Sequence, residues 1–388
     1  MPVLPDDIPE STLRVLLAGG LGPVTLARLR ERFGSDGAIA TASRRDLRTV
    51  PGIGDQRARS IANELRTAAT SNERRVMRDA GAVLILEQDE HYPPLLRGLP
   101  AAPPALWVTG SLRHVDGEHD EAIAIVGARR CSTYGRSQAA HFARVLAECG
   151  LTIVSGGAIG IDAEAHRAAL RAGGHTIAVL GSGLARPHPR SHAGLFAAMV
   201  DAGSAVVSEF PMTTAPRPAL FPRRNRVISG LSRGVVVVEA GRRSGALLTA
   251  GCAVEQHGRD AMVIPGPVDA PGSAGCNAAL REAWAAPVLE PLHVLEQIGG
   301  IGCRAARRAE AIGGAASAPA QVASFVEATS PAGRRILEAL PADGSGMDID
   351  TLAAAADIEI VPCLVEITRL EVAGLLGRTP GLVHRRRA

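Results

Sequence analysis

The sequence predicts a doubly wound α/β domain with a mostly parallel sheet, set between two small helical units. Eight short apolar runs lie between residues 82 and 266 without alternating polar positions. Segments with helical spacing, such as residues 134–150 and 161–174, separate most of the later runs. Strands that are apolar on both faces indicate a parallel sheet covered by crossover helices on both sides. Glycine turns and helical spacing near the two ends of the chain predict the flanking units.

The eight apolar runs are expected to be the strands of one Rossmann-like domain that spans residues 71–299. Ligands of such sheets bind outside the carboxyl ends of the strands, so the turns that follow the strands are where a site is expected. The expected strands are residues 82–86, 105–110, 123–127, 151–156, 176–181, 205–209, 234–240 and 261–266.

Residues 1–70 are expected to form a small helical domain with two glycine turns. Residues 19–23 and the Pro-Gly-Ile-Gly turn at 51–54 each precede a helical segment, and this arrangement resembles helix–hairpin–helix or SAM-like units. Two interpretations fit the turns. Their N–H groups hold a DNA phosphate, or glycine only joins packed helices. Arg57 and Arg59 are the basic side chains nearest the second turn.

The C-terminal part is expected to be a linker at residues 300–328 and a winged helix at 329–388. The linker is rich in Ala, Gly and Ser,. The third predicted helix carries Glu366 and Glu371 against Arg369. Because acidic side chains oppose phosphate contact, we favour a protein-contact or regulatory role here. Weak DNA contacts are then expected from the arginines at 378, 385, 386 and 387.

Composition excludes several classes of protein. The 388 residues suffice for two to three domains, and 46% of them are hydrophobic, which predicts a folded core,. The six cysteines form no CxxC pair, so we expect free thiols in a reducing cytosol and no metal site,. No signal-peptide pattern and no run of about 18 apolar residues occurs, so we expect a cytoplasmic protein without membrane contact.

Arginine is concentrated in the middle of the chain. All 42 basic residues are arginines, and the formal net charge is only +3. Three windows without acidic residues, 122–147, 165–200 and 210–238, hold four, four and five arginines. Guanidinium groups bind phosphate in a bidentate manner and stack on bases. These windows predict a polyanion site, although a solvated basic loop is the alternative interpretation.

Glycine, hydroxyl and arginine residues meet in the predicted turns after the central strands. Glycine lets the backbone approach phosphate, and arginine neutralises it. The spacing is not GxGxxG, so no nucleotide cofactor is expected. Candidate residues are Arg129 and Arg130 after one strand, Ser155, Gly156 and Gly157 after the next, Arg186 and Arg190 further on, and Arg223, Arg224, Asn225 and Arg226 in the FPRRNR segment.

The sequence contains no convincing catalytic set. It has no G-x-S-x-G elbow, no Walker lysine and no carboxylate cluster for two metal ions,. Asp162 and His166 form either an acid/base pair or a helix-start acid beside a buried histidine. Ser244 and Thr249 near Glu239 are either hydroxyl ligands or residues that start and pack a helix. We therefore expect no enzymatic activity.

Several ordered blocks together resemble one family. IAIVGARRCSTYGR, VSGGAIGIDAEAHRAAL, FPRRNRVISGL, VVVVEAGRRSGALLTAGCAVEQ and GCNAALRE are similar to the DprA/Smf family of DNA-processing proteins, over about residues 10–299. The resemblance implies a cytoplasmic homodimer that is not an enzyme. It would bind and protect single-stranded DNA and load a RecA-type recombinase during natural transformation and recombination.

The resemblance also implies which residues face DNA. These are Arg129, Ser155, Gly156, Gly157 and residues 223–226, with the loop at 186–190 beside them. Tyr134, Phe210 and Phe221 are the aromatic side chains near these positions, and we expect them to stack on bases. Members of the family often carry arginine where this chain has Ile159, so one phosphate contact is missing and Arg130 or Arg190 is expected to compensate.

Two other functions remain open from the sequence. A related class of Rossmann-like hydrolases cleaves nucleoside monophosphates with a PGGxGTxxE helix start, and AGRRSGALLTAGCAVEQ stands at the corresponding place with its glycines and acid out of register. A winged helix is also typical of transcription regulators, although the acidic third helix opposes that function.

Overall fold

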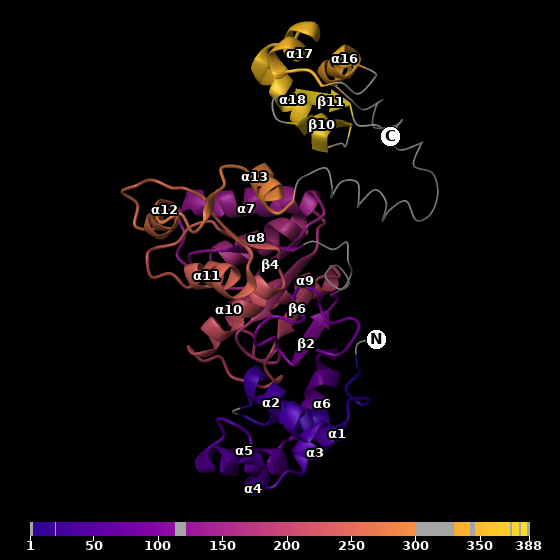
Figure 1. Cartoon of the computed structure of the whole chain (residues 1–388), viewed down its shortest axis with the longest axis vertical. Coiled ribbons are helices and arrows are strands. Elements are labelled where there is room, and N and C mark those ends of the chain that lie inside the picture. The colour runs from indigo at the N-terminus through magenta and orange to yellow at the C-terminus, as the bar shows by residue number, and fades with distance from the viewer. Residues whose placement is uncertain are drawn as a thin grey trace. The chain divides into compact units, whose positions relative to one another are not determined.

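The computed structural model describes residues 3–19, 21–112, 122–299, 330–341, 346–372, 375–379 and 382–385 (Figure 1). The predicted linker at 300–328 and the arginines at 386 and 387 lie outside these residues. Contacts divide the chain into two units, Met1–Pro291 and Leu292–Ala388.

A nine-stranded sheet is the centre of the first unit, with the strand order β1-β2-β6-β5-β4-β3-β7-β8-β9. β2 is antiparallel to both of its neighbours, and every other pairing is parallel. The strands are β1 (Val83–Leu86), β2 (Ala105–Gly110), β3 (Ala122–Val126), β4 (Thr152–Ser155), β5 (Thr176–Leu180), β6 (Ala205–Ser208), β7 (Gly234–Val237), β8 (Asp260–Val263) and β9 (Ala286–Pro287).

The predicted mostly parallel α/β sheet is therefore confirmed. All eight predicted runs form strands, and the two-residue β9 is the strand that the sequence reasoning missed. The central strands β3, β4 and β5 are buried along their whole length, as apolar runs without alternation predict,.

Helices pack on both faces of the sheet. Val126, Val154 and Val235 point to one face, where residues of α10, α11 and α12 complete a large core. Ala178 and Val206 point to the other face and pack against α9. The helices are α7 (Thr133–Glu148), α8 (Ile161–Arg171), α9 (Ala193–Asp201), α10 (Leu220–Gly230), α11 (Gly245–His257) and α12 (Ala274–Arg281), with a short 3-10 turn at Arg190–His192.

The N-terminal residues form the predicted helical region. Its apolar side chains, such as Leu29, Ile39 and Ile61, gather in a core of their own. A second cluster, which includes Met77, Trp107 and Met212, joins α1 and α6 to the sheet. The helices are α1 (Glu10–Leu17), α2 (Pro23–Phe33), α3 (Asp36–Ala40), α4 (Arg44–Leu47), α5 (Asp55–Thr67) and α6 (Thr70–Asp79).

The second glycine turn is held by arginines of its own domain. Gly52 has a φ of 84°, which favours glycine,. Arg28 Nη1 donates to the Pro51 carbonyl oxygen over 3.2 Å, and Arg57 Nη1 donates to the Gly52 carbonyl oxygen over 3.2 Å. Arg57, a candidate helper for phosphate at this turn, therefore braces the turn instead.

The described residues of the second unit include α13 (Pro291–Gln297), which begins at the boundary between the units, and a group of three helices and a two-stranded antiparallel hairpin. α16 (Pro331–Ala339), α17 (Ile349–Ala355) and α18 (Ile360–Val372) pack around one apolar core with β10 (Leu376–Thr379) and β11 (Leu382–Arg385). The assignment of these elements as a winged helix stays a prediction. Glu366 is almost buried and accepts a hydrogen bond from Ser330 Oγ over 2.5 Å. The Glu366 carboxylate is therefore used within the fold, and it adds little to the acidic surface that was predicted for α18.

The strand order places a crevice beside β3. From β3 the chain adds β4, β5 and β6 on one side, and it then returns to add β7 and β8 on the other side. Turns that leave β3 and its neighbours diverge at such a switch point, where doubly wound sheets bind their ligands.

Candidate nucleic-acid interface

A pocket of about 350 Å³ lies at this switch point, and we call it the strand-end pocket. It combines the turns after β3 and β4 with the starts of α10 and α11. It is lined by Val126, Gly127, Arg129, Ala158, Asp162, Phe221, Pro222, Arg224, Asn225, Ile228, Ser244, Gly245, Ala246, Leu248 and Thr249. Arg129, Arg224 and Asn225 are therefore brought together, as the sequence predicted.

Close backbone contacts shape the turns after β3 and β4. A Cβ on Gly127 would lie 2.6 Å from the Ile161 side chain, so only glycine fits there. Gly160 has a φ of 89°, and its α-carbon lies against the Ala128 and Arg129 carbonyl groups. Ala128 N donates to the Glu239 carbonyl oxygen over 2.7 Å, which ties the turn after β3 to the end of β7.

Ser155 and Gly156 are buried, and their assignment as DNA contacts stays a prediction. Ser155 Oγ donates to the Ile125 carbonyl oxygen over 2.6 Å. Gly156 N donates to Asp162 Oδ2 over 3.1 Å. Gly157 is also buried and has a φ of 65°, and a Cβ on it would lie 2.8 Å from the Phe196 ring. The Ser155 hydroxyl and the Gly156 N–H group are therefore already hydrogen-bonded within the protein.

Arg224 is also buried, since only 5% of the residue is exposed, and its assignment as a DNA contact stays a prediction. Its Nη1 donates to the Gly156 carbonyl oxygen over 2.7 Å and also to the Val179 carbonyl oxygen. Burial lowers the pKa of Arg224 to about 10, so the group remains charged at neutral pH. Arg224 thus joins the ends of β4 and β5 and brings positive charge close to the wall of the pocket.

Arg226 and Asn225 are also engaged inside the protein. Arg226 is paired with the buried carboxylate of Glu209 and donates to the Ala101 carbonyl oxygen. Asn225 Nδ2 donates to the Gly245 carbonyl oxygen over 3.3 Å while the residue still lines the pocket. The assignment of Arg226 as a phosphate contact stays a prediction, and in this structure its guanidinium is already paired with the Glu209 carboxylate.

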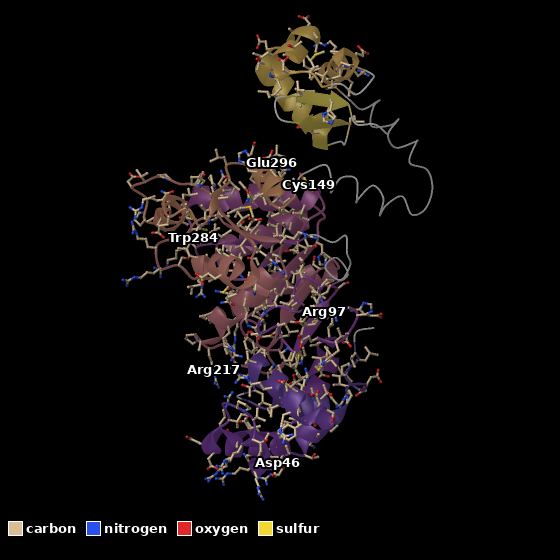
Figure 2. The ribbon with its side chains drawn as sticks, in the orientation of Figure 1. Asp46, Arg97, Cys149, Arg217, Trp284 and Glu296 are labelled. Carbon is tan, nitrogen blue, oxygen red and sulfur yellow. The ribbon has the colours of Figure 1, made fainter. Side chains whose placement is uncertain are left out.

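Exposed arginines surround the buried ones. Arg129, Arg130, Arg186, Arg190 and Arg223 are exposed, and so is Arg217 in the segment between β6 and α10. Figure 2 labels Arg217 at the edge of the first unit. These side chains come from three different turns, so the acid-free windows of the sequence converge on one end of the sheet.

Two of these arginines lie over aromatic rings. The guanidinium carbon of Arg129 lies 5.4 Å from the centre of the Phe221 ring, and that of Arg223 lies 5.4 Å from the centre of the Phe210 ring. The His188 ring lies 5.6 Å from the Phe221 ring. A cation over a ring face is attracted to it, so each ring helps to hold its arginine in place.

Two of the expected stacking residues have limited access. Phe210 is 6% exposed, and Phe221 packs against Arg129 and His188 while it also lines the pocket. Their assignment as stacking residues stays a prediction. Tyr134, in the first turn of α7, is exposed and keeps its assignment as a prediction.

The residues considered as catalytic groups make hydrogen bonds within the protein. The Glu239 carboxylate accepts hydrogen bonds from Ser132 N over 3.0 Å and from Ser132 Oγ over 2.9 Å. Ser244 Oγ accepts from Ala246 N at the start of α11. Thr249 Oγ1 donates to the Gly245 carbonyl oxygen over 3.4 Å.

Asp162 and His166 do not pair with each other. Burial raises the pKa of Asp162, whereas Arg224 and the N–H groups of residues 156 and 158 act in the opposite direction. His166 Nδ1 lies 2.7 Å from Thr176 Oγ1, and burial lowers the pKa of His166 to about 3. The acid starts a helix and the histidine is a neutral core residue. Within the described part of the chain, no three His, Cys, Asp or Glu side chains gather as a metal site requires.

Comparisons with known proteins identify the family. The model of the family described as DNA recombination-mediator protein A matches residues 83–299, which is the whole nine-stranded sheet. The chain belongs to the DprA/Smf family. A second model, of a SAM-like helix-hairpin-helix tandem, matches residues 14–67.

Relatives of the DprA/Smf family match different lengths of the chain. Protein Smf of Escherichia coli is 48% identical over 55% of this chain and 56% of the relative, so this match spans about half of that protein. Protein Smf of a Synechocystis species is 30% identical over 95% of this chain and 96% of the relative. The structure of DNA processing protein A from Streptococcus pneumoniae has a TM-score of 0.64 at 31% identity, covering 75% of this chain and 98% of that one.

Ile159 is where this member departs from the arginine expected in a DprA/Smf protein. Ile159 is 53% exposed and lies in sequence between Ala158, which lines the pocket, and Gly160, whose φ is 89°. An exposed apolar residue therefore stands in the turn after β4. Among the described helices, none is long and apolar enough to cross a membrane.

Proposed function

We propose that the strand-end pocket binds single-stranded DNA. Membership of the DprA/Smf family supports a role in DNA processing. The observation that carries the proposal is the pair of exposed arginines, Arg129 and Arg223, which lie over the Phe221 and Phe210 rings beside the pocket.

A flat guanidinium serves a single strand in two ways. Its edge donates to phosphate oxygens, and its open face stacks on a base. Bases of a single strand are available for stacking, whereas those of a duplex are already stacked within it. Arg129 and Arg223 therefore favour single strands, and binding by them is tolerant of sequence and sensitive to salt.

The remaining exposed arginines extend this interface along the backbone of the strand. Arg186 and Arg190 stand on the loop after β5, and Arg130 stands next to Arg129. The buried Arg224 adds positive charge behind the wall of the pocket, where low polarity weakens screening,. The buried glycines keep the strand ends close enough for these side chains to act on one ligand.

The biological part of the proposal follows from the family. We propose that the chain acts as a cytoplasmic homodimer that protects incoming single strands and helps to load a RecA-type recombinase on them during DNA uptake and recombination. No catalytic step is needed for this role. The hydrolase alternative loses support because the Glu239 carboxylate is already bonded to Ser132.

The test is fluorescence anisotropy with labelled single-stranded oligonucleotides across a salt series. Arg129→Ala plus Arg223→Ala is expected to weaken binding at least tenfold and to reduce the salt slope by about 1.4 units, since each lost phosphate contact on a single strand removes about 0.7. Arg144→Ala plus Arg171→Ala is the control, because it removes two exposed arginines near the C-terminal ends of α7 and α8. Equal losses in the two variants would reject the strand-end pocket as the site.

A further inference from the structure

A second surface rich in arginine lies on the N-terminal helices, outside the strand-end pocket. An open groove of about 560 Å³ runs along α4 and α5, and we call it the α4–α5 face. Three arginines line it, Arg44, Arg59 and Arg66, together with the polar side chains of Gln56, Ser60 and Asn63. Its lining includes no acidic and no aromatic residue.

Helical spacing places these groups in one row. Residues 56, 59, 60, 63 and 66 recur at intervals of three and four along α5, while Ala58, Ile61 and Leu65 on the opposite side are buried in the domain core,. Ten residues of helix cover about 15 Å. One strand of a duplex carries a phosphate about every 3.4 Å along its axis, so the row matches about four phosphates.

The charges of the face are not balanced by its own acids. Arg44, Arg48 and Arg59 all lie within 4.0 Å of a single carboxylate, that of Asp55, at N···O distances of up to 3.8 Å. A hydrogen bond from Arg44 holds the pKa of Asp55 below its usual range, so Asp55 carries one negative charge against three positive ones. The three arginine side chains are 45%, 58% and 69% exposed.

Arg66 and Ser60 each make a hydrogen bond within α5. Arg66 Nη2 donates to Asn63 Oδ1 over 3.0 Å, so its hydrogen-bond partner on this face is a neutral amide. Ser60 Oγ donates to Glu64 Oε1 over 3.0 Å. Four arginines thus stand against two carboxylates, and the surplus lies along one side of α5.

We propose that the α4–α5 face binds the phosphate backbone of double-stranded DNA, as a site separate from the strand-end pocket. Arg, Asn, Gln and Ser side chains are those that hold duplex phosphates without reading bases. A face without aromatic residues offers no ring for unstacked bases, so it suits a duplex better than a single strand. An acidic protein partner is disfavoured because the lining holds no large apolar anchor, which protein interfaces normally need,.

This site would let one chain hold a duplex and a single strand at the same time. The test uses the full chain, a labelled blunt duplex and a labelled single-stranded oligonucleotide. Arg59→Ala plus Arg66→Ala is expected to weaken duplex binding about tenfold and to reduce its salt slope by about 1.8 units, with single-strand affinity changed less than twofold. The matched control is Arg75→Ala plus Arg78→Ala, which removes two exposed arginines from α6.

The outcomes separate this proposal from the proposed function. Duplex binding that is absent, or that both double variants weaken equally, would overturn the α4–α5 site and leave the single-strand result intact. Loss of both ligands in the Arg59/Arg66 variant would also overturn it, because the face would then belong to the single-strand site. Saturating unlabelled single strand is expected not to displace the duplex. Polyglutamate that competes as well as duplex at equal charge would instead indicate an acidic protein as the partner.

Discussion

The strand-end pocket and the α4–α5 face are both rich in arginine, but they are built in different ways. The pocket buries one arginine, Arg224, and lays two others on aromatic rings. The α4–α5 face keeps its arginines on the surface, around the one carboxylate of Asp55. The number of arginines on a surface therefore does not by itself determine which ligand that surface binds. Burial decides which arginines shape the site, and aromatic support decides whether a base or only a phosphate is held.

The largest expected effect is on stability, from Arg224→Ala. Removing a buried guanidinium leaves two carbonyl groups and the Asp162 carboxylate without their partner. A loss of about 3–5 kcal/mol in the free energy of unfolding is expected. Chemical denaturation measures it, and Arg223→Ala next to it serves as the control, with a change within about 0.5 kcal/mol. Similar stability of the two variants would contradict a structural role for Arg224.

A pH dependence of stability is expected from the buried histidine near the pocket. Burial lowers the pKa of His166 to about 3, below its ordinary 6.5. Between these values the unfolded chain binds a proton that the folded chain excludes, so stability falls as the pH is lowered from 6.5 toward 3.

Replacing His166 with glutamine is expected to flatten this dependence by up to about 1.4 kcal/mol per pH unit. Urea denaturation between pH 7 and pH 4 measures the slope for both proteins. An unchanged slope would mean that other groups cause the acid sensitivity. Only a smaller effect of the same sign is expected from Asp55 on the α4–α5 face, because Arg44 lowers the pKa of that carboxyl while solvent screens the exposed pair,.

Phe221→Leu tests the support that separates the two surfaces. Without the aromatic ring, the Arg129 guanidinium loses the contact that holds it in place. Single-strand affinity is expected to fall by about three- to tenfold, which corresponds to a stacking contact of roughly 1 kcal/mol, while duplex affinity stays the same. Anisotropy with both ligands measures the ratio. A parallel loss of duplex affinity would remove the distinction between the pocket and the α4–α5 face.

The smallest expected effect comes from Ile159→Arg. Ile159 is exposed and follows Ala158 of the pocket lining, so an arginine side chain can be accommodated there. Single-strand affinity is expected to rise a few-fold, with the salt slope steeper by about 0.7 unit. A salt titration of the variant against Ile159→Gln separates charge from side-chain length. Equal behaviour of the two variants would show that no phosphate passes this position.

The sheet could be predicted from the sequence because its strands are short apolar runs bounded by glycine turns. The antiparallel direction of β2 could not be predicted, since pairing direction depends on contacts with β1 and β6 that are distant in sequence. The two-residue β9 carries too few residues for a pattern.

The turns after the strands pointed to the residues that the structure brings together in the pocket, but the internal bonding of Arg224 and Arg226 was not foreseen. Residue type does not separate Arg223 from Arg224. Helical spacing does, because Arg224 lies three and four positions before the buried Val227 and Ile228 on α10,. An arginine on the apolar face of a helix is a candidate for internal bonding. The pairing of Arg226 with Glu209 had no such signal, since Glu209 lies on another segment.

The most direct test compares both double variants with both ligands in one anisotropy experiment. Arg129→Ala plus Arg223→Ala is predicted to lose single-strand binding and keep duplex binding. Arg59→Ala plus Arg66→Ala is predicted to do the reverse. Each pair removes two exposed arginines, so total charge cannot explain a crossed result. Equal losses of both ligands in both variants would contradict the account, because they would show one diffuse basic surface in place of two distinct sites.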